Sequence, residues 1–215
     1  MKITLLCSDP QHPVNAYIQR WAEAQEGSHE VDIVQKKSQL GGGEILFLIS
    51  CSELINANDR AQYKVCLVLH ASDLPFGRGW SPHIWELVQG AEAIILSMLE
   101  AEDRVDSGRI WRKVRISVPK HALWDEINHI LFTAEVGMID YAVQNYLLTT
   151  PQAQSKTDQA TYYPRRTPED SQIDPHKSIA EQFDLIRVCD PFRFPAYFEY
   201  MGQRYILKLE KTNER

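Results

Sequence analysis

The stretch KVCLVLHASDLPFGRGWSPH, from Lys64 to His83, decides how this chain folds. The run from Val65 to Leu69 is uniformly apolar, which is typical of a strand covered on both faces of a parallel sheet. The apolar run ends at His70, and a turn rich in Asp, Pro and Gly follows directly. Because side chains alternate along a strand, Cys66, Val68 and His70 share one face. His70 is therefore expected at the carboxyl end of its strand, where open α/β sheets place their ligand crevices.

His70 has two interpretations at this point. A single histidine at a strand end is more often a packed structural residue than a catalytic group. The turn after it is built for a sharp bend, because Pro75, Gly77 and Gly79 supply rigidity and backbone freedom. Ser81-Pro82 then starts a helix, with serine as the expected N-cap and proline at the first position.

The first 95 or so residues alternate between strand and helix patterns. Asn15–Ala24 has the apolar spacing of an amphipathic helix. Apolar runs predict strands at Ile3–Cys7, Glu30–Val34, Ile45–Ile49 and Tyr63–Leu69. This alternation predicts an α/β fold with a Rossmann-like core and a mostly parallel sheet.

The pattern changes in the second half of the chain. Ala93–Leu99 and Gly108–Val118 predict an antiparallel hairpin, and an apolar stripe predicts a long helix over Lys120–Leu148. We divide the chain into a catalytic domain, residues 1–148, and a C-terminal extension, residues 149–215. In the extension we expect a long surface loop, a helix and a hairpin, at Thr149–Asp170, Lys177–Val188, Ala196–Tyr200 and Tyr205–Leu209.

Composition limits the classes of function. A chain of 215 residues with 44% hydrophobic residues suits one compact domain with a small appendage. A net charge of -6 argues against a nucleic-acid partner bound through a basic surface. No apolar run approaches the roughly 18 residues of a membrane helix, and the N-terminus does not look like a secretory signal. The four cysteines lack metal-site spacing, so we expect reduced thiols, no metal and a cytoplasmic protein.

Asp106 is a second candidate for chemistry. It stands in VDSG at the end of the acidic loop EAEDRVDSG, and aspartate before Ser-Gly is common in turns for local hydrogen-bonding reasons. Alone, it therefore has a structural interpretation as well.

Together these segments resemble a known family. HASDLPFGRGWSPHIWELVQG followed by EAEDRVDSGRI is similar to the folate-dependent formyltransferases, including methionyl-tRNA formyltransferase. Their usual pattern is Asn-x-His, a turn with Leu-Pro and Arg-Gly, a Pro-led helix and a later Asp-x-Gly. The matching residues are His70, Leu74-Pro75, Arg78-Gly79, Pro82 and Asp106-x-Gly108. The resemblance covers residues 44–146 well and the C-terminal part more loosely. It implies an enzyme that takes a formyl group from 10-formyltetrahydrofolate and passes it to a primary amine.

The resemblance also implies roles for individual residues. His70 would polarise the formyl oxygen and stabilise the developing oxyanion, while Asp106 would orient His70 or a water and assist removal of the amine proton. The folate would be held largely by backbone, at Ser50, Cys51, Ser52, Glu53 and Leu54 and at Glu102, Asp103 and Val105. From the residues alone, SCSELI is equally a strand-to-helix turn.

One position departs from the family pattern. The asparagine two residues before the histidine is Val68 here, and valine donates no hydrogen bond. Losing one oxyanion donor lowers turnover by about 10²–10³. Either Ser72 or a backbone N–H of the turn replaces it, or the protein is slow or inactive.

Three branches of the family differ in the acceptor amine. The short C-terminus and acidic charge disfavour a tRNA acceptor, and SDPQHPVNAY lacks the Gly-rich phosphate loop of the glycinamide-ribonucleotide branch. Tyr162–Asp190, YYPRRTPEDSQIDPHKSIAEQFDLIRVCD, resembles the branch that formylates nucleotide-linked amino sugars for surface glycans. That resemblance, together with the charges, suggests substrate contacts at Arg78, Trp80, Arg165 and Arg166. The last two would pair with a diphosphate, or would simply be a solvated basic pair.

The sequence therefore predicts an N-formyltransferase acting on the amine of a nucleotide-linked amino sugar. Two alternatives stay open: a non-catalytic homologue that binds folate or a sugar nucleotide, and a formyltransferase for another primary amine. The oligomeric state is open, and the C-terminal hairpin is the expected contact of a homodimer.

Overall fold

A central sheet organises the chain, whose computed structural model describes residues 1–155 and 160–212. Its strand order is β2-β1-β3-β4-β6-β7. The first four strands in this order are parallel, and β4, β6 and β7 pair in antiparallel fashion. The bounds are β1 Lys2–Leu6, β2 Glu30–Val34, β3 Gly43–Leu48, β4 Tyr63–His70, β6 Ala93–Glu100 and β7 Ile110–Ser117. The predicted α/β class with a mostly parallel sheet is confirmed.

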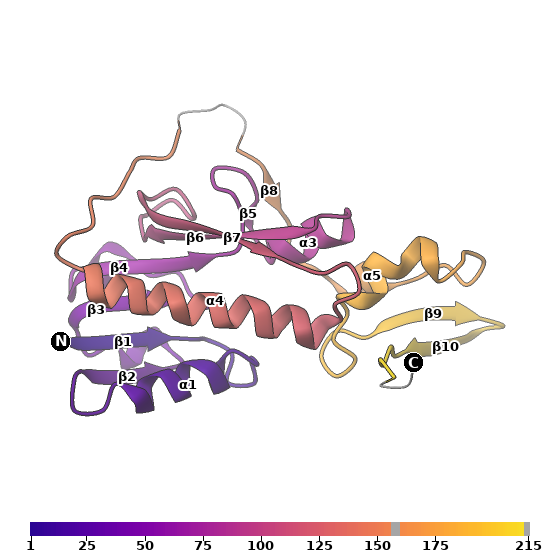
Figure 1. The fold of residues 1–215 in the computed structure, drawn as a ribbon, viewed down its shortest axis with the longest axis horizontal. Helices are drawn as coiled ribbons and strands as arrows, with labels where there is room; N and C mark the ends of the chain where they lie inside the picture. Colours follow the sequence, from indigo (N-terminus) through magenta and orange to yellow (C-terminus); the bar gives the residue numbers. More distant parts are fainter. Residues whose placement is uncertain (156–159, 213–215) are drawn as a thin grey trace.

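The long helix α4 lies along the sheet (Figure 1). The larger apolar cluster packs α1, α3 and α4 against one face and includes Leu67 and Leu69. The smaller cluster lies on the other face and includes Cys66, with Val68 packed against it. The predicted alternation along β4 is therefore correct. The helical bounds are α1 Asn15–Ala24, α2 Ala57–Arg60, α3 Pro82–Val88, α4 Trp124–Asn145 and α5 Phe183–Arg187, with 3-10 turns at Lys37–Gln39, Pro168–Ser171 and Ala180–Gln182.

The ends of α3 and α4 differ from the predictions. Ser81 precedes α3 in a left-handed conformation, and its side chain makes no capping hydrogen bond. Helix α4 is shorter than the predicted 120–148, because Glu126 accepts the backbone N–H of Leu123 at 2.8 Å and fixes the start there. Leu147 and Leu148, beyond its other end, are exposed.

The predicted surface loop over residues 149–170 is more structured than expected. Strand β8, Tyr162–Tyr163, pairs in parallel with β5, Arg78–Gly79, in the turn that follows His70. Gln152 forms a further bridge with Ile110. Backbone groups of this segment thus find their partners in the turn and on β7, which is why a polar sequence is held in place. Residues 156–159 of the predicted loop lie outside the described residues.

The C-terminal elements are also shifted. The helix predicted over 177–188 is reduced to a 3-10 turn and α5. At its start, Glu181 accepts the N–H of Ser178, and Gln182 accepts that of Asp174. The hairpin strands are β9 Ala196–Tyr200 and β10 Gln203–Leu207, so the second strand begins two residues earlier than predicted. Met201 and Gly202, at φ 50° and 74°, form the two-residue turn.

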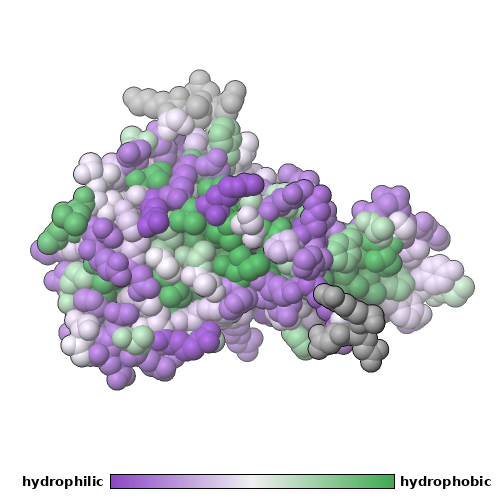
Figure 2. All heavy atoms as spheres, viewed as in Figure 1, coloured by the Kyte–Doolittle hydropathy of each residue, from purple (hydrophilic) through white to green (hydrophobic). Residues whose placement is uncertain are grey.

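The hairpin extends beyond one end of the sheet (Figure 1). Apolar side chains gather where it joins the rest of the molecule (Figure 2), over the small cluster of Ile173, Ile186, Cys189 and Ala196. Arg187, 1% exposed, fixes this region to the core by contacting Asp184 at 2.7 Å and the carbonyl of Ala122 at 3.4 Å. The domain division at residue 148 stays a prediction. In the described ranges, no helix combines the length and apolarity needed to cross a membrane.

Candidate active site

His70 is the last residue of β4 and is 8% exposed. Its Nε2 lies 2.9 Å from the carbonyl oxygen of Gly77. A carbonyl only accepts hydrogen bonds, so this contact assigns a proton to Nε2. Nδ1 lies 3.6 Å from Oδ1 of Asp106. That distance is too long for a hydrogen bond but places a carboxylate directly against the second ring nitrogen. The structure therefore brings together the two predicted catalytic residues.

The backbone around Asp106 explains the Asp-x-Gly spacing. Asp106 has a left-handed φ of 54°, which turns its side chain back toward β4. Its Oδ2 accepts the N–H of Gly79 at 2.9 Å, and its carbonyl accepts Nε2 of Gln154 at 2.9 Å. Gly108 approaches β6 so closely that a Cβ would collide with the carbonyl oxygen of Glu100. A glycine is therefore required two residues after the aspartate.

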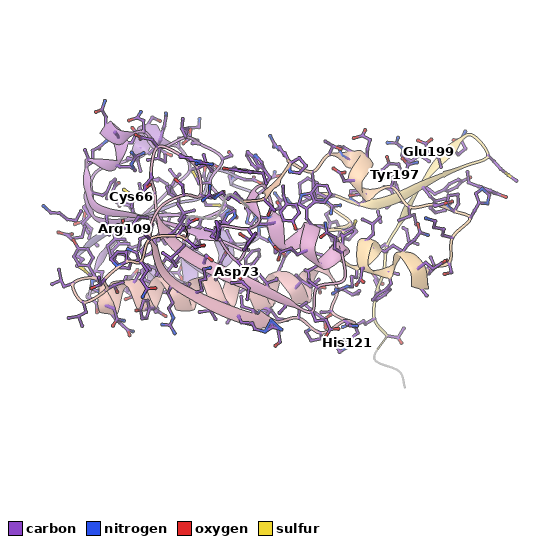
Figure 3. All side chains as sticks on the ribbon, turned by 90° about the horizontal axis from the view of Figure 1, so that it is seen from above. Cys66, Asp73, Arg109, His121, Tyr197 and Glu199 are labelled. Atoms are coloured by element: carbon purple, nitrogen blue, oxygen red, sulfur yellow. The ribbon has the colours of Figure 1, made fainter. Side chains whose placement is uncertain are left out.

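The turn between His70 and α3 is held from two sides. Lys113 on β7 donates to Oδ1 of Asp73 and to the carbonyl of Leu74, both at 2.6 Å; Figure 3 shows where Asp73 lies. Gly79 has φ 96°, and a Cβ there would collide with the carbonyl oxygen of Tyr163 on β8. The glycine thus allows β5 and β8 to pair, and this pairing aims the Gly79 N–H at Asp106.

Several groups near Val68 could be weighed as the missing donor. The backbone N–H groups of residues 72, 76, 77, 78, 79 and 80 all donate to protein oxygens. The thiol of Cys66 contacts the carbonyl of Arg60 at 3.7 Å, and burial raises its pKa to about 12. The hydroxyl of Ser72 is buried and has no hydrogen-bond partner among the described residues. The Ser72 hydroxyl is therefore a candidate for the donor that Val68 lacks.

The two loops predicted to hold folate are joined by one arginine. Arg60 donates to the carbonyl of Ile55 at 2.7 Å, next to the first loop, and to Asp103 at 2.5 Å in the second. Leu54 and Val105, one on each loop, are 63% and 54% exposed. The other predicted residues of the first loop have contacts within the protein. Ser50 and Ser52 are hydrogen-bonded to Ser8, Glu53 accepts the N–H of Lys37, and the Cys51 thiol contacts the carbonyl of Glu53. In the second loop, Glu102 is exposed.

The four predicted substrate contacts lie around the β5–β8 pairing. Arg78 is 6% exposed and donates to Tyr162 Oη at 3.3 Å and Gln154 Oε1 at 2.8 Å. Arg165 covers the ring of Trp80, its guanidinium carbon 5.0 Å from the ring centroid. Arg166 lies over the ring of Trp85 and donates to the carbonyl of Asp170 at 2.8 Å. Arg166 is thus engaged within the protein, whereas Arg165 and the half-exposed Trp80 form a joint surface.

Several buried or half-buried polar residues near this edge were not singled out from the sequence. Glu135 on α4 is 6% exposed, its Oε2 has no partner among the described residues, and burial raises its pKa to about 8. Burial, with the nearby charges of His70, His12 and Arg166, lowers the pKa of His83 to about 3. Burial and the Arg193 charge lower that of His12 to about 4. One signal was present: Glu135 falls at helical spacing from Leu131 and Met138, on the apolar stripe.

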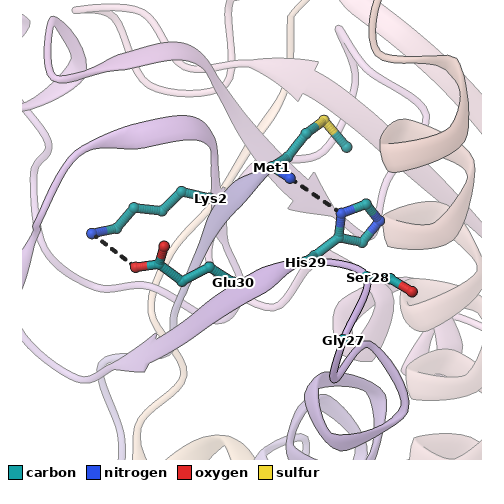
Figure 4. Close-up of a pocket in the computed structure, with 6 residues that line it drawn as sticks. All are labelled: Met1, Lys2, Gly27, Ser28, His29 and Glu30. Atoms are coloured by element: carbon teal, nitrogen blue, oxygen red, sulfur yellow. Dashed lines mark hydrogen bonds and ion pairs between the residues drawn. The ribbon is translucent and has the colours of Figure 1, made fainter.

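A groove of about 470 Å³ lies at the opposite edge of the sheet and holds none of the predicted residues (Figure 4). Met1, Lys2 and Gly27–Glu30 line it, beside the amino ends of β1 and β2. The N-terminal amine lies 3.4 Å from Nδ1 of His29, and Lys2 pairs with Glu30 at 3.3 Å. Neither His70 nor Asp106 lines this groove.

No protein-family model matches the sequence. Solved structures match the fold over nearly the whole chain. Methionyl-tRNA formyltransferase from Clostridium thermocellum has a TM-score of 0.80 at 24% identity, covering 95% of this chain and 90% of that chain. A 4-N formyltransferase from Francisella tularensis has a TM-score of 0.76 at 16% identity, covering 99% and 98%. HypX from Aquifex aeolicus, in complex with tetrahydrofolic acid, has a TM-score of 0.79 at 18% identity, covering 95% of this chain and 36% of that one. This chain therefore has the fold of the formyltransferases.

Proposed function

We propose that the protein is an N-formyltransferase that moves a formyl group from 10-formyltetrahydrofolate to the amine of a nucleotide-linked amino sugar. The observation that carries the proposal is the contact of His70 with Asp106 at the carboxyl edge of a formyltransferase fold. A histidine and a carboxylate in contact are the groups that formyl transfer to an amine requires, because the attacking amine must lose a proton.

The contacts of the two ring nitrogens support a different role for each. Nε2–H is fixed on the carbonyl of Gly77, so Nδ1 is the nitrogen at which a proton is gained or lost. A proton on Nδ1 is met by Oδ1 of Asp106. Asp106 is itself held by the Gly79 N–H, so its second oxygen stays aimed at the histidine. The pair is built to hold the proton that the acceptor amine releases.

The loops beside the pair fit a folate. The exposed side chains of Leu54 and Val105 offer apolar contacts for a flat ring, and Arg60 holds the loops that carry them in one arrangement. When bound there, 10-formyltetrahydrofolate supplies the activated formyl group. The likeness to HypX in complex with tetrahydrofolic acid supports a folate at this edge.

The acceptor is proposed from the β5–β8 region and from a second likeness. The 4-N formyltransferase matches this chain from end to end, including the C-terminal elements. Trp80 and Arg165 present an exposed aromatic ring beside a cation, a surface that suits a sugar or base next to a phosphate. We place the reaction in the synthesis of surface glycans on this basis.

The test is a product assay. Purified protein is mixed with 10-formyltetrahydrofolate and a panel of nucleotide-linked amino sugars, and mass spectrometry follows the gain of one formyl group. Formylation of at least one sugar, with release of tetrahydrofolate, is expected. A panel that also holds simple primary amines separates sugar from non-sugar acceptors. Free formate without a formylated product would identify a hydrolase and contradict the proposal.

Val68 motivates a second candidate, a non-catalytic protein that binds folate or a sugar nucleotide. Val68, two residues before His70, offers no hydrogen-bond donor, and the side chain of Ser72 is buried. Tight folate binding with no product from any acceptor in the same assay would favour this candidate.

A further inference from the structure

A pocket of about 340 Å³ lies next to the Asp106 loop and is lined by three arginines. Arg78, Arg104 and Arg109 contribute to its wall, together with Glu102 and Gln154. Arg109 is neutralised, because its Nε contacts Oε2 of Glu100 at 2.8 Å. The other two arginines are the unusual feature of this pocket.

Arg78 and Arg104 converge on a single neutral oxygen. Arg78 donates to Oη of Tyr162 at 3.3 Å, and Arg104 donates to the same oxygen at 3.1 Å. Among the described residues, neither arginine forms an ion pair with a carboxylate. The two cations together lower the pKa of the Tyr162 phenol, which shows how positive the point is where they meet.

Of the two arginines, Arg78 has the greater need of a compensating anion, because it is buried. It is 6% exposed, and its Nε is buried with no hydrogen-bond partner among the described residues. Burying a guanidinium is unfavourable unless an anion compensates it. Among the described residues its hydrogen-bond partners are the neutral oxygens of Tyr162 and Gln154. Within residues 1–155 and 160–212, no carboxylate compensates the charge of Arg78.

The same pocket is connected to the catalytic carboxylate. Gln154 accepts from Arg78 at 2.8 Å and donates to the carbonyl oxygens of Asp106 and Gly108, both at 2.9 Å. The neighbours of Arg78 in sequence complete the site, since Gly77 holds His70 and Gly79 holds Asp106. A ligand bound to Arg78 would therefore lie beside the two residues, Gly77 and Gly79, that contact His70 and Asp106.

We propose that this pocket, defined by Arg78, Arg104 and Tyr162, binds an oxyanion group carried by one of the two reactants. Paired guanidinium groups recognise phosphate and carboxylate oxygens alike, so the shared chemistry is an anionic oxygen cluster. The inference rests on the proposed function for the identity of the reactants. The diphosphate of a sugar nucleotide and the glutamate carboxylates of a folate are the two sources.

Calorimetric titration tests the site without any turnover. Inorganic pyrophosphate is titrated at low salt into the wild-type protein, Arg104→Gln and Arg115→Gln. Arg104 is exposed, so its replacement leaves the core intact, and Arg115 is an exposed arginine on β7 outside the pocket that serves as the matched control. Loss of one charge-assisted contact is expected to weaken binding about tenfold or more in Arg104→Gln and to leave Arg115→Gln at the wild-type value. Tyr162→Phe, which frees both guanidinium groups, is expected to bind at least as tightly as wild type.

A second titration with p-aminobenzoyl-L-glutamate distinguishes the sources. Arginine-dependent binding of pyrophosphate alone assigns the pocket to the sugar nucleotide, and arginine-dependent binding of the second probe alone assigns it to the folate. Equal affinity in wild type, Arg104→Gln and Arg115→Gln, or no binding of either probe, would overturn the inference. Arginine-dependent binding in a protein that formylates no acceptor would retain this site and reject the proposed function instead.

Discussion

The Asp106 carboxylate lies against Nδ1 of His70, at 3.6 Å, while its other oxygen accepts the N–H of Gly79 at 2.9 Å. His70 ends β4, whereas Asp106 lies in the loop between β6 and β7, and Gly79 in the turn between β4 and α3 holds the carboxylate beside the histidine. Since Nε2 of His70 is held by Gly77, the contact leaves a single nitrogen for proton transfer. The chemistry that we propose depends on this pair.

The first prediction concerns the charge of Asp106. Asp106→Asn keeps an oxygen for the Gly79 N–H but removes the carboxylate that meets a proton on His70. Formyl transfer is expected to fall by about 10² or more, because general acid–base assistance contributes factors of that size. The kcat for a formylated acceptor measures the effect, and circular dichroism confirms the fold. A variant with wild-type kcat would show that the carboxylate plays no part in the proton transfer.

A second prediction concerns the glycine that allows β5 to pair with β8. Gly79 and Gly90 have similar backbone angles, φ 96° and 91°, but only at Gly79 would a Cβ meet a backbone oxygen. Gly79→Ala is therefore expected to lower the free energy of unfolding by about 2 kcal/mol more than Gly90→Ala, which suffers the conformational strain alone. Urea denaturation of both variants gives the comparison. Equal losses would mean that the β5–β8 contact adapts freely.

The third prediction uses the buried carboxyl of Glu135. Burial raises its pKa in the folded protein to about 8, above the ordinary 4.5, so the folded state holds a proton that the unfolded state releases in between. The contribution of Glu135 to the free energy of unfolding is therefore fully present below pH 4.5. It is lost as the pH rises toward 8, by roughly 1.4 kcal/mol per pH unit. Glu135→Gln cannot ionise, so the melting temperature of the variant minus that of wild type should increase steadily from pH 5 to pH 8. A difference that does not change with pH would contradict the burial argument.

Acid stability gives a fourth prediction with the opposite sign. Burial lowers the pKa of His83 to about 3, below the ordinary 6.5, so the unfolded state binds a proton that the folded state refuses. Stability from His83 is therefore present above pH 6.5 and is lost as the pH falls toward 3. His83→Gln should lose less stability than wild type between pH 7 and pH 4 in urea titrations. His121→Gln, at an exposed position, serves as the control and should follow the wild-type curve.

The sheet was predictable from local sequence patterns, and the meeting of His70 and Asp106 was expected from the resemblance to a family motif. The apolar run ending at His70 defines a strand end, and the spacing of Asp106 and Gly108 matches a motif whose glycine the close approach to Glu100 explains. The second half of the site was not predictable in this way. Tyr162 and Gln154 lie in a polar segment without periodicity, and their positions follow from long-range pairing with the turn after His70.

The C-terminal differences show what residue patterns leave out. Helical spacing is present over 177–188, yet this stretch forms only a 3-10 turn and α5, with Glu181 and Gln182 accepting the N–H groups of Ser178 and Asp174. Glu135 shows the reverse case, in which a charged residue occupies a core position of α4 and would ordinarily be assigned to the surface.

The most direct measurement of the central claim follows an isotopic label. Protein is incubated with folate carrying a ¹³C-formyl group and an acceptor amino sugar, and the label on the sugar is quantified for wild type and His70→Ala. With wild type, ¹³C is expected on the amine of the acceptor. With His70→Ala, the rate of labelling is expected to fall by about 10² or more, at unchanged folate affinity. Equal rates of label transfer in the two proteins would contradict this central claim.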